Sequence, residues 1–175
     1  MKNNVLRDLA ETSLFAALIF VSVYALRIPV GAQFIHFGNA LVVVGVLLFG
    51  AKKGATAAAL GLGIFDLVTG YASVAWITIL ESLIVCLVLY VVYEKALKQN
   101  DKTANVIAVG VLAAVTKIVL NLIKYTIMGS LVGGTTFGAA FGLSLVKILG
   151  SYGSALATII AVPILYPIFK QILKK

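Results

Sequence analysis

The chain has 175 residues, of which 62% are hydrophobic and 11% are charged, and its formal net charge is +8. Soluble domains carry about 25% charged residues. This composition excludes a soluble enzyme, a disordered tail and a nucleic-acid-binding module, because the basic residues lie in small groups between long apolar runs. A spanning helix needs about 20 apolar residues, so the length allows about six spans in a single membrane domain over residues 1–175.

Six apolar segments, separated by charges, prolines and glycines, are predicted to be helices. They cover residues 9–26, 37–49, 55–68, 74–93, 105–128 and 143–169. The second and third segments are short for full spans, so we expect them to be tilted or partly buried in the protein. The predicted fold is an all-α integral membrane protein with six transmembrane helices.

The basic residues indicate which ends of these helices face the cytoplasm. If the N-terminus is inside, the outer connections contain only Arg27. Ten basic residues then fall on the inner side: Lys2, Arg7, Lys52, Lys53, Lys95, Lys98, Lys102, Lys170, Lys174 and Lys175. This positive-inside bias predicts that both termini are cytoplasmic. The first apolar run lacks a small-residue cleavage site, so it is interpreted as a retained span.

Charged residues inside the predicted spans are costly, and such residues usually face a cavity or a partner. Five charged residues from four predicted helices fall in the outer half of the membrane or near its midplane: Asp66, Glu81, Lys117, Lys124 and Lys147. Asn39 belongs to the same layer. Lys117, Asn121 and Lys124 have the i, i+4, i+7 spacing that keeps them on one helix face. Internal ion pairing is the alternative, but two acids cannot neutralise three lysines. We therefore predict a polar pocket that opens outward.

Aromatic residues surround the same layer: Phe34, His36, Tyr71, Trp76, Tyr125 and Phe137. Interface anchoring is the plain interpretation of Trp and Tyr at this level, and the only histidine is most simply a solvated loop residue. Flat rings beside convergent polar groups also suit a small aromatic ligand, on which Trp76 or Tyr125 would stack. The connection 27–36 is long enough to fold over the pocket, which makes Phe34 and His36 candidates for a gate. The glycine-rich connection 129–138 is a second candidate for a mobile segment.

Several motifs are missing from the sequence. The glycine-rich stretch 50–56 lacks the lysine of a nucleotide-binding loop, so ATP hydrolysis by this chain is not expected. The sequence has no nucleophile–base pair and no Cys/His metal cluster, and Cys86 is interpreted as a buried, inert thiol. In the first segment, small residues four apart (Ser13 and Ala17, and likewise Thr12 and Ala16) allow close helix approach, either within the protein or to a partner membrane protein.

Three stretches carry a family resemblance: IHFGNA at 35–40, LFGAKKG at 48–54 and GLGIFDLVTGY at 61–71. With the length, the six segments and the alanine-rich first helix, they resemble the substrate-binding S-component of a bacterial energy-coupling-factor (ECF) vitamin transporter. The similarity is to the riboflavin S-component-like subgroup, which includes proteins assigned to hydroxymethylpyrimidine or pyridoxine. Ser13 and Thr12 stand where the family's docking motif usually has alanine.

The resemblance implies a multi-pass protein of the bacterial cell membrane that captures a vitamin from outside with high affinity. Its first helix would dock on a transmembrane coupling protein, and two cytoplasmic ATPase subunits would drive transport by toppling the S-component in the lipid bilayer. This chain would bind no cofactor, since the ATP is used by its partners, and no nucleic acid.

The favoured ligand is hydroxymethylpyrimidine or pyridoxine, with Asp66 and Glu81 accepting hydrogen bonds from it. The surplus of one lysine leaves open an anionic vitamin, and riboflavin is a further possibility within the family. A stand-alone proton-coupled carrier, with Asp66 and Glu81 as protonation sites, is the alternative from another class. An integral membrane enzyme is a weaker alternative, because the sequence offers no nucleophile–base pair.

Overall fold

The computed structural model describes residues 2–31 and 33–173, and most of them are helical. Met1, Ala32, Lys174 and Lys175 lie outside these ranges, and the side chains of residues 2–4 are not described. The helices are α1 (Lys2–Ala25), α2 (Gly38–Phe49), α3 (Ala51–Val68), α4 (Ala75–Leu89), α5 (Thr103–Leu131), α6 (Phe137–Lys147) and α7 (Leu149–Leu173). A short 3₁₀ helix (Ala72–Val74) precedes α4, and a π-helix (Tyr90–Ala96) continues it.

Four helical segments are long and apolar enough to cross a membrane: Val5–Ala25, Ala72–Ala96, Thr103–Leu131 and Leu149–Leu173. The helices Gly38–Phe49 and Phe137–Lys147 are apolar but shorter. An all-helical membrane protein is therefore the right class, and the first five predicted helices fall where the apolar runs predicted them.

The connections differ from the prediction in two places. The segment 27–36, expected to be a plain loop, contains a hairpin of β1 (Ile28–Val30) and β2 (Gln33–Ile35), in which Ile28 pairs with Ile35 and Val30 with Gln33. This hairpin is the one departure from an all-α chain within the described residues. The sixth predicted helix, 143–169, is instead two helices that break at Ile148, and α6 begins at Phe137 inside the stretch expected to be a loop.

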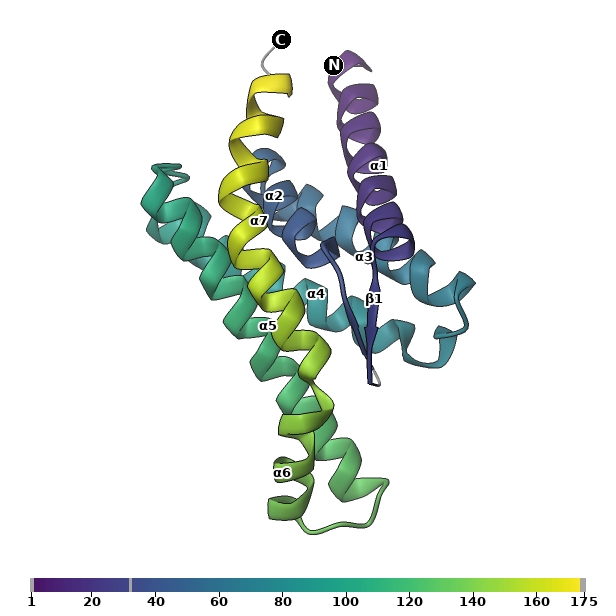
Figure 1. The fold of residues 1–175 in the computed structure, drawn as a ribbon. Coiled ribbons are helices and arrows are strands. Elements are labelled where there is room, and N and C mark those ends of the chain that lie inside the picture. Colours follow the sequence, from purple (N-terminus) through teal and green to yellow (C-terminus); the bar gives the residue numbers. More distant parts are fainter. Residues whose placement is uncertain (1, 32, 174–175) are drawn as a thin grey trace.

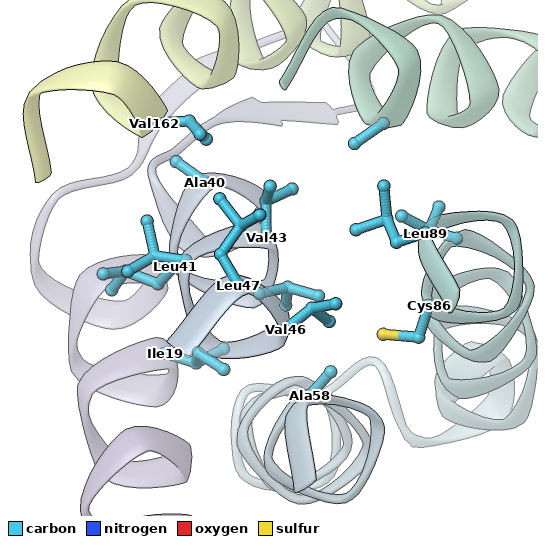
Figure 2. Close-up of a cluster of buried hydrophobic side chains, with 14 of the residues drawn as sticks. Ile19, Ala40, Leu41, Val43, Val46, Leu47, Ala58, Cys86, Leu89 and Val162 are labelled. Atoms are coloured by element: carbon cyan, nitrogen blue, oxygen red, sulfur yellow. The ribbon is translucent and has the colours of Figure 1, made fainter. Parts of the chain in front are cut away.

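Helix α2 forms the centre of the molecule. It is apolar on every side, which is typical of a helix that is buried all round. Figure 2 shows its side chains surrounded by those of other helices: Ile19 of α1, Ala58 of α3, Cys86 and Leu89 of α4, and Val162 of α7. Cys86 is buried, as the sequence predicts. Glycines bring the neighbours close, since a Cβ on Gly54 would lie 2.5 Å from the Val46 side chain.

The two ends of the helix bundle differ in what they contain (Figure 1). One end, called the terminal end below, contains the start of α1, the end of α7, the α2–α3 joint at Gly50 and the connection 97–102. The opposite end contains the β-hairpin, the 69–74 connection and the α5–α6 turn. Helices α5 and α6 pair as a helical hairpin that extends beyond the other elements at that end (Figure 1). The connections predicted to be inner and those predicted to be outer thus lie at opposite ends of the bundle.

Candidate functional site

A cavity of about 170 Å³ lies at the hairpin end, between the β-hairpin and helices α3, α4, α5 and α7. Four of the five charged residues predicted for the pocket line this cavity, together with polar and aromatic groups. The lining includes Gln33, Phe34, His36, Asn39, Phe65, Asp66, Tyr71, Thr78, Glu81, Lys117, Asn121, Lys124, Tyr125, Ser151 and Ser154. The structure therefore brings together residues from segments far apart in the sequence.

Glu81 forms the charged centre of the cavity. Lys117 Nζ donates to Glu81 Oε2 at 2.5 Å, and Lys124 Nζ lies 2.8 Å from Glu81 Oε1. The two lysines face the same carboxylate because they lie seven residues apart on one face of α5, as their spacing predicts. All three side chains are largely removed from solvent, with exposed fractions of 8%, 16% and 21% for Glu81, Lys117 and Lys124. One acid on α4 thus holds two cations of α5.

Asp66 contrasts with Glu81. It lies in the last turn of α3, is 6% exposed and lines the cavity. Its Oδ2 is buried and has no hydrogen-bond partner among the described residues. A buried carboxylate oxygen without a donor is unfavourable, so this atom is available for a ligand that brings one.

Aromatic rings form the wall next to Asp66. Phe65 stacks on Tyr71 with the ring centroids 6.5 Å apart at an interplanar angle of 15°, and Phe34 meets Tyr71 edge-on at 5.8 Å. Behind the wall, the Arg27 guanidinium lies 4.9 Å from the centre of Phe34 and 5.1 Å from that of Phe65. Arg27 does not line the cavity and its buried Nη1 has no hydrogen-bond partner among the described residues, so these cation–π contacts are what hold the guanidinium against the two rings.

The β-hairpin is fixed over the cavity mainly by one side chain. Gln33 donates to Asn121 Oδ1 at 3.1 Å and accepts from both the backbone N and the Oγ of Ser151, at 2.9 and 3.0 Å. Ser154 adds two bonds, accepting from His36 N and donating to Phe34 O, each at 3.1 Å. The strand can approach α7 because of glycine, since a Cβ on Gly150 would lie 2.6 Å from Gln33 Cβ.

His36 differs from the solvated histidine that the sequence suggests. It lies between β2 and α2, lines the cavity, and its Nδ1 accepts from Gly38 N at 3.1 Å. Burial of the ring, and secondarily the charge of Lys117, lowers the pKa of His36 to about 4. The imidazole is therefore neutral near pH 7 and caps the start of α2. No group of three His, Cys, Asp or Glu side chains suited to a metal occurs within residues 2–31 and 33–173.

Comparison with known protein families matches nearly the whole chain to one family. Residues 3–174 match the family model described as ECF-type riboflavin transporter, S component. The chain belongs to this family. Comparisons with curated proteins and with solved structures gave no significant match. The protein is accordingly a multi-pass membrane transporter subunit that binds a substrate for vitamin uptake, and not a catalytic enzyme. ECF S components work with a membrane coupling protein and ATPases.

Two of the residues predicted for the S component's site lie outside its cavity. Trp76 is 64% exposed on the outer surface of α4 and does not line the cavity, so it is not placed to stack on a ligand there. Lys147 is exposed at the end of α6, just before the helix break, and its Nζ lies 5.3 Å from the Tyr125 ring. Removing Lys147 from the set leaves two acids and two lysines in the cavity, so the predicted surplus of positive charge is absent there.

The residues that sequence reasoning missed are mostly small and uncharged. Gln33, Ser151 and Ser154 hold the hairpin, and Thr78 lines the wall. One signal was available on α7: Ser151, Ser154 and Thr158 are spaced three and four apart and therefore share one face of an otherwise apolar helix. Gln33 has no comparable signal, because its role depends on how the hairpin meets α5 and α7.

The two small-residue lines of α1 have different surroundings. Ala16 is 7% exposed and faces α3, where a Cβ on Gly61 would lie 2.6 Å from Ala16 O. The line through Thr12 and Ala16 is therefore used for packing inside the protein. Ser13 and Ala17 are both exposed on the outer face of α1.

Proposed function

We propose that this S component captures a small, single-ring aromatic vitamin or vitamin precursor, hydroxymethylpyrimidine or pyridoxine, from outside the cell. The observation that carries the proposal is the cavity itself. Its volume of about 170 Å³ is below the ~300–1,000 Å³ usual for drug-sized ligands. Its walls supply aromatic faces from Phe34, Tyr71 and Tyr125 together with convergent polar groups, the combination that suits one flat heterocycle.

Riboflavin is the competing ligand because the matching family model names it. A three-ring compound with a polyol chain requires a larger space than the cavity offers, unless the β-hairpin moves away. The anionic alternative rested on a surplus lysine. With Lys147 outside, the charges of Asp66, Glu81, Lys117 and Lys124 balance, which favours a ligand without a net negative charge.

The proposed topology has six crossings with both termini in the cytoplasm of a bacterial plasma membrane. Helices α6 and α7 would form one broken crossing, and α1 to α5 the other five. The described terminal end carries Arg7, Lys52, Lys53, Lys95, Lys98, Lys102 and Lys170, as the positive-inside rule requires of a cytoplasmic side. Phe34 and His36, on the segment over the cavity, would then face the outside and serve as its gate.

Transport would depend on partners. The exposed Ser13 and Ala17 would contact the transmembrane coupling protein, and two cytoplasmic ATPase subunits would use ATP, with no cofactor bound by this chain. Ala17→Leu should abolish uptake by the assembled transporter and leave ligand affinity unchanged. Ala108→Leu, at an exposed alanine of α5, is the matched control. Equal uptake by both variants would exclude this docking face.

The deciding experiment is to purify the protein in detergent without added ligand, denature it and identify the released small molecules by mass spectrometry. A stoichiometric one-ring B vitamin or precursor is the expected result, and riboflavin would overturn the substrate assignment. If the protein is empty, titration against the B-vitamin panel follows. Absence of any submicromolar binding would overturn the capture function and favour a proton-coupled carrier using Asp66 and Glu81.

A further inference from the structure

Two buried acidic oxygens of the cavity, Asp66 Oδ2 and Glu81 Oε1, have no hydrogen-bond partner among the described residues, but only Asp66 Oδ2 also has no lysine in salt-bridge contact. Both oxygens of Glu81 face lysines, Oε2 facing Lys117 and Oε1 facing Lys124. Asp66 has no salt bridge among the described residues, and its Oδ2 has no hydrogen-bond donor. The two acids therefore have separate roles, because Glu81 is engaged by the protein and Asp66 is not.

The surroundings of Asp66 restrict what can reach it. Phe65 precedes it in α3 and stacks on Tyr71, which in turn meets Phe34 edge-on at 5.8 Å. All three rings line the same cavity as the carboxylate. A flat ring lying against this aromatic wall presents its edge to Asp66, so the substituent on that edge decides how well the ligand fits.

We propose that Asp66 is the specificity-determining residue of the cavity: it accepts a hydrogen bond from the amino group of an amino-substituted nitrogen heterocycle, an aminopyrimidine in particular. It discriminates against rings of the same shape that carry a methyl group or a carbonyl oxygen at that place. This inference rests on the proposed capture of a small heterocycle and narrows it to one chemical class.

The physical reason is the state of Asp66 when no donor is present. A buried carboxylate oxygen that remains unpaired after the ligand excludes water is strongly unfavourable. An amino group satisfies it with a charge-assisted hydrogen bond. A methyl group leaves the oxygen unpaired, and a carbonyl oxygen places a second acceptor against it. Sites built to bind a donor reject analogues that lack it for this reason.

The test compares three ligands in the wild-type protein by isothermal titration: 4-amino-5-hydroxymethyl-2-methylpyrimidine, its 4-methyl analogue and its 4-oxo analogue. We expect the amino compound to bind about 10- to 100-fold more tightly than the 4-methyl compound, the range for one hydrogen bond to a charged group. The 4-oxo compound should also bind less tightly than the amino compound, because its carbonyl oxygen is an acceptor at the amino position and only the adjacent ring N–H can donate. Equal affinity for the amino and 4-methyl compounds, or preference for the 4-oxo compound, would overturn the inference.

An Asp66 variant tests whether this residue is responsible for the discrimination between the three ligands. Asp66→Asn should lower affinity for the amino compound and raise it for the 4-oxo compound, because an amide can donate as well as accept. Asp8→Asn, which changes an exposed carboxylate at the terminal end, should leave all three affinities unchanged. The wild-type comparison decides the matter if Asp66→Asn does not fold. If none of the three compounds binds and another vitamin does, this inference fails while the capture function stands; if no vitamin of the panel binds, both fail.

Discussion

The two ends of the molecule use charged residues in opposite ways. At the terminal end, Lys53 pairs with Asp8 and Glu11, and Asp101 pairs with Lys170 and accepts from Tyr166 Oη at 2.7 Å. Apart from Glu11, which is 14% exposed, these side chains are partly exposed, and their acids have partners. In the cavity the charged groups are buried, one acid serves two lysines, and a second acid has an unpaired oxygen.

This difference shows what each arrangement contributes. Each solvent-exposed ion pair contributes little to the free energy of unfolding, and such pairs chiefly set the relative positions of chain segments. Removing one partner of a buried ion pair lowers stability much more, because the remaining charge stays buried without compensation. Substitutions in the cavity should therefore have large effects on both stability and binding, and substitutions at the terminal end small ones.

The largest effect is expected at Glu81. Glu81→Gln leaves Lys117 and Lys124 buried without a counter-charge, and removing one partner of a buried ion pair costs about 3–5 kcal/mol. We expect a markedly lower melting temperature in detergent and ligand affinity reduced by at least about 100-fold, with membrane insertion intact. Asp8→Asn, at a carboxylate that is 55% exposed, is the control at the terminal end. Wild-type affinity in Glu81→Gln would contradict the role assigned to this carboxylate.

A smaller effect is expected where the hairpin is fixed. Gln33→Ala removes three hydrogen bonds, and Asn121→Ala removes the one that Gln33 donates to α5. Ligand should dissociate about 10-fold faster from Gln33→Ala, because a hydrogen bond contributes about 0.5–1.5 kcal/mol net. Asn121→Ala should weaken binding less. Stopped-flow measurement of ligand dissociation from the double variant tests whether Gln33 and Asn121 act together. If the changes in activation free energy of dissociation add fully, the two residues act independently.

Asp101 should give a small effect that depends on pH. Hydrogen bonds from Lys170 and Tyr166 lower the pKa of Asp101 below its ordinary value of 3.8. Its contribution to stability is therefore present above about pH 4 and lost as the pH falls through the lowered pKa. Asp101→Asn should lower stability by about 0.5 kcal/mol at pH 7 and leave ligand affinity unchanged. Melting curves of the variant and the wild type should converge below pH 3.8, and a constant gap would argue against this pairing.

The smallest effect is expected at Trp76. Its side chain is 64% exposed and lies outside the cavity, so Trp76→Phe should change ligand affinity by less than about twofold. Tyr71→Leu, which removes a ring from the cavity wall, is the informative contrast and should weaken binding clearly. A large loss in Trp76→Phe would restore the stacking role that the sequence suggests for this residue.

The sequence predicts much of this architecture because apolar runs, charges and helix spacing carry the information. The shared face of Lys117, Asn121 and Lys124 and the layer containing Asp66 and Glu81 could be read from position alone. Trp76 and Lys147 lie in that layer too, but their direction around the helix depends on packing and on the break at Ile148. Position along the helix bundle is thus predictable from sequence, whereas the direction in which a side chain points around its helix is less so.

Other features required the three-dimensional contacts. The role of Gln33 depends on Gly150 and Gly153, which let the strand approach α7, and no local pattern reports a contact across more than 110 residues. Asn121 illustrates the same limit. It is a pocket residue as predicted, but its amide bonds to Gln33 and to Lys117 O, so it acts through the hairpin.

The length of α5 has a consequence for the membrane itself. Its 29 residues make a rod of about 43 Å, longer than the ~30 Å hydrocarbon core of a bilayer. Leu131 and Phe137 at the tip are 79% and 67% exposed, which disfavours a tip standing in water. The helix fits best when it leans, and acyl-chain length sets how far. Because α5 carries Lys117 and Lys124, any tilt of α5 relative to α4 would move these lysines with respect to Glu81, and we therefore expect ligand affinity to depend on bilayer thickness.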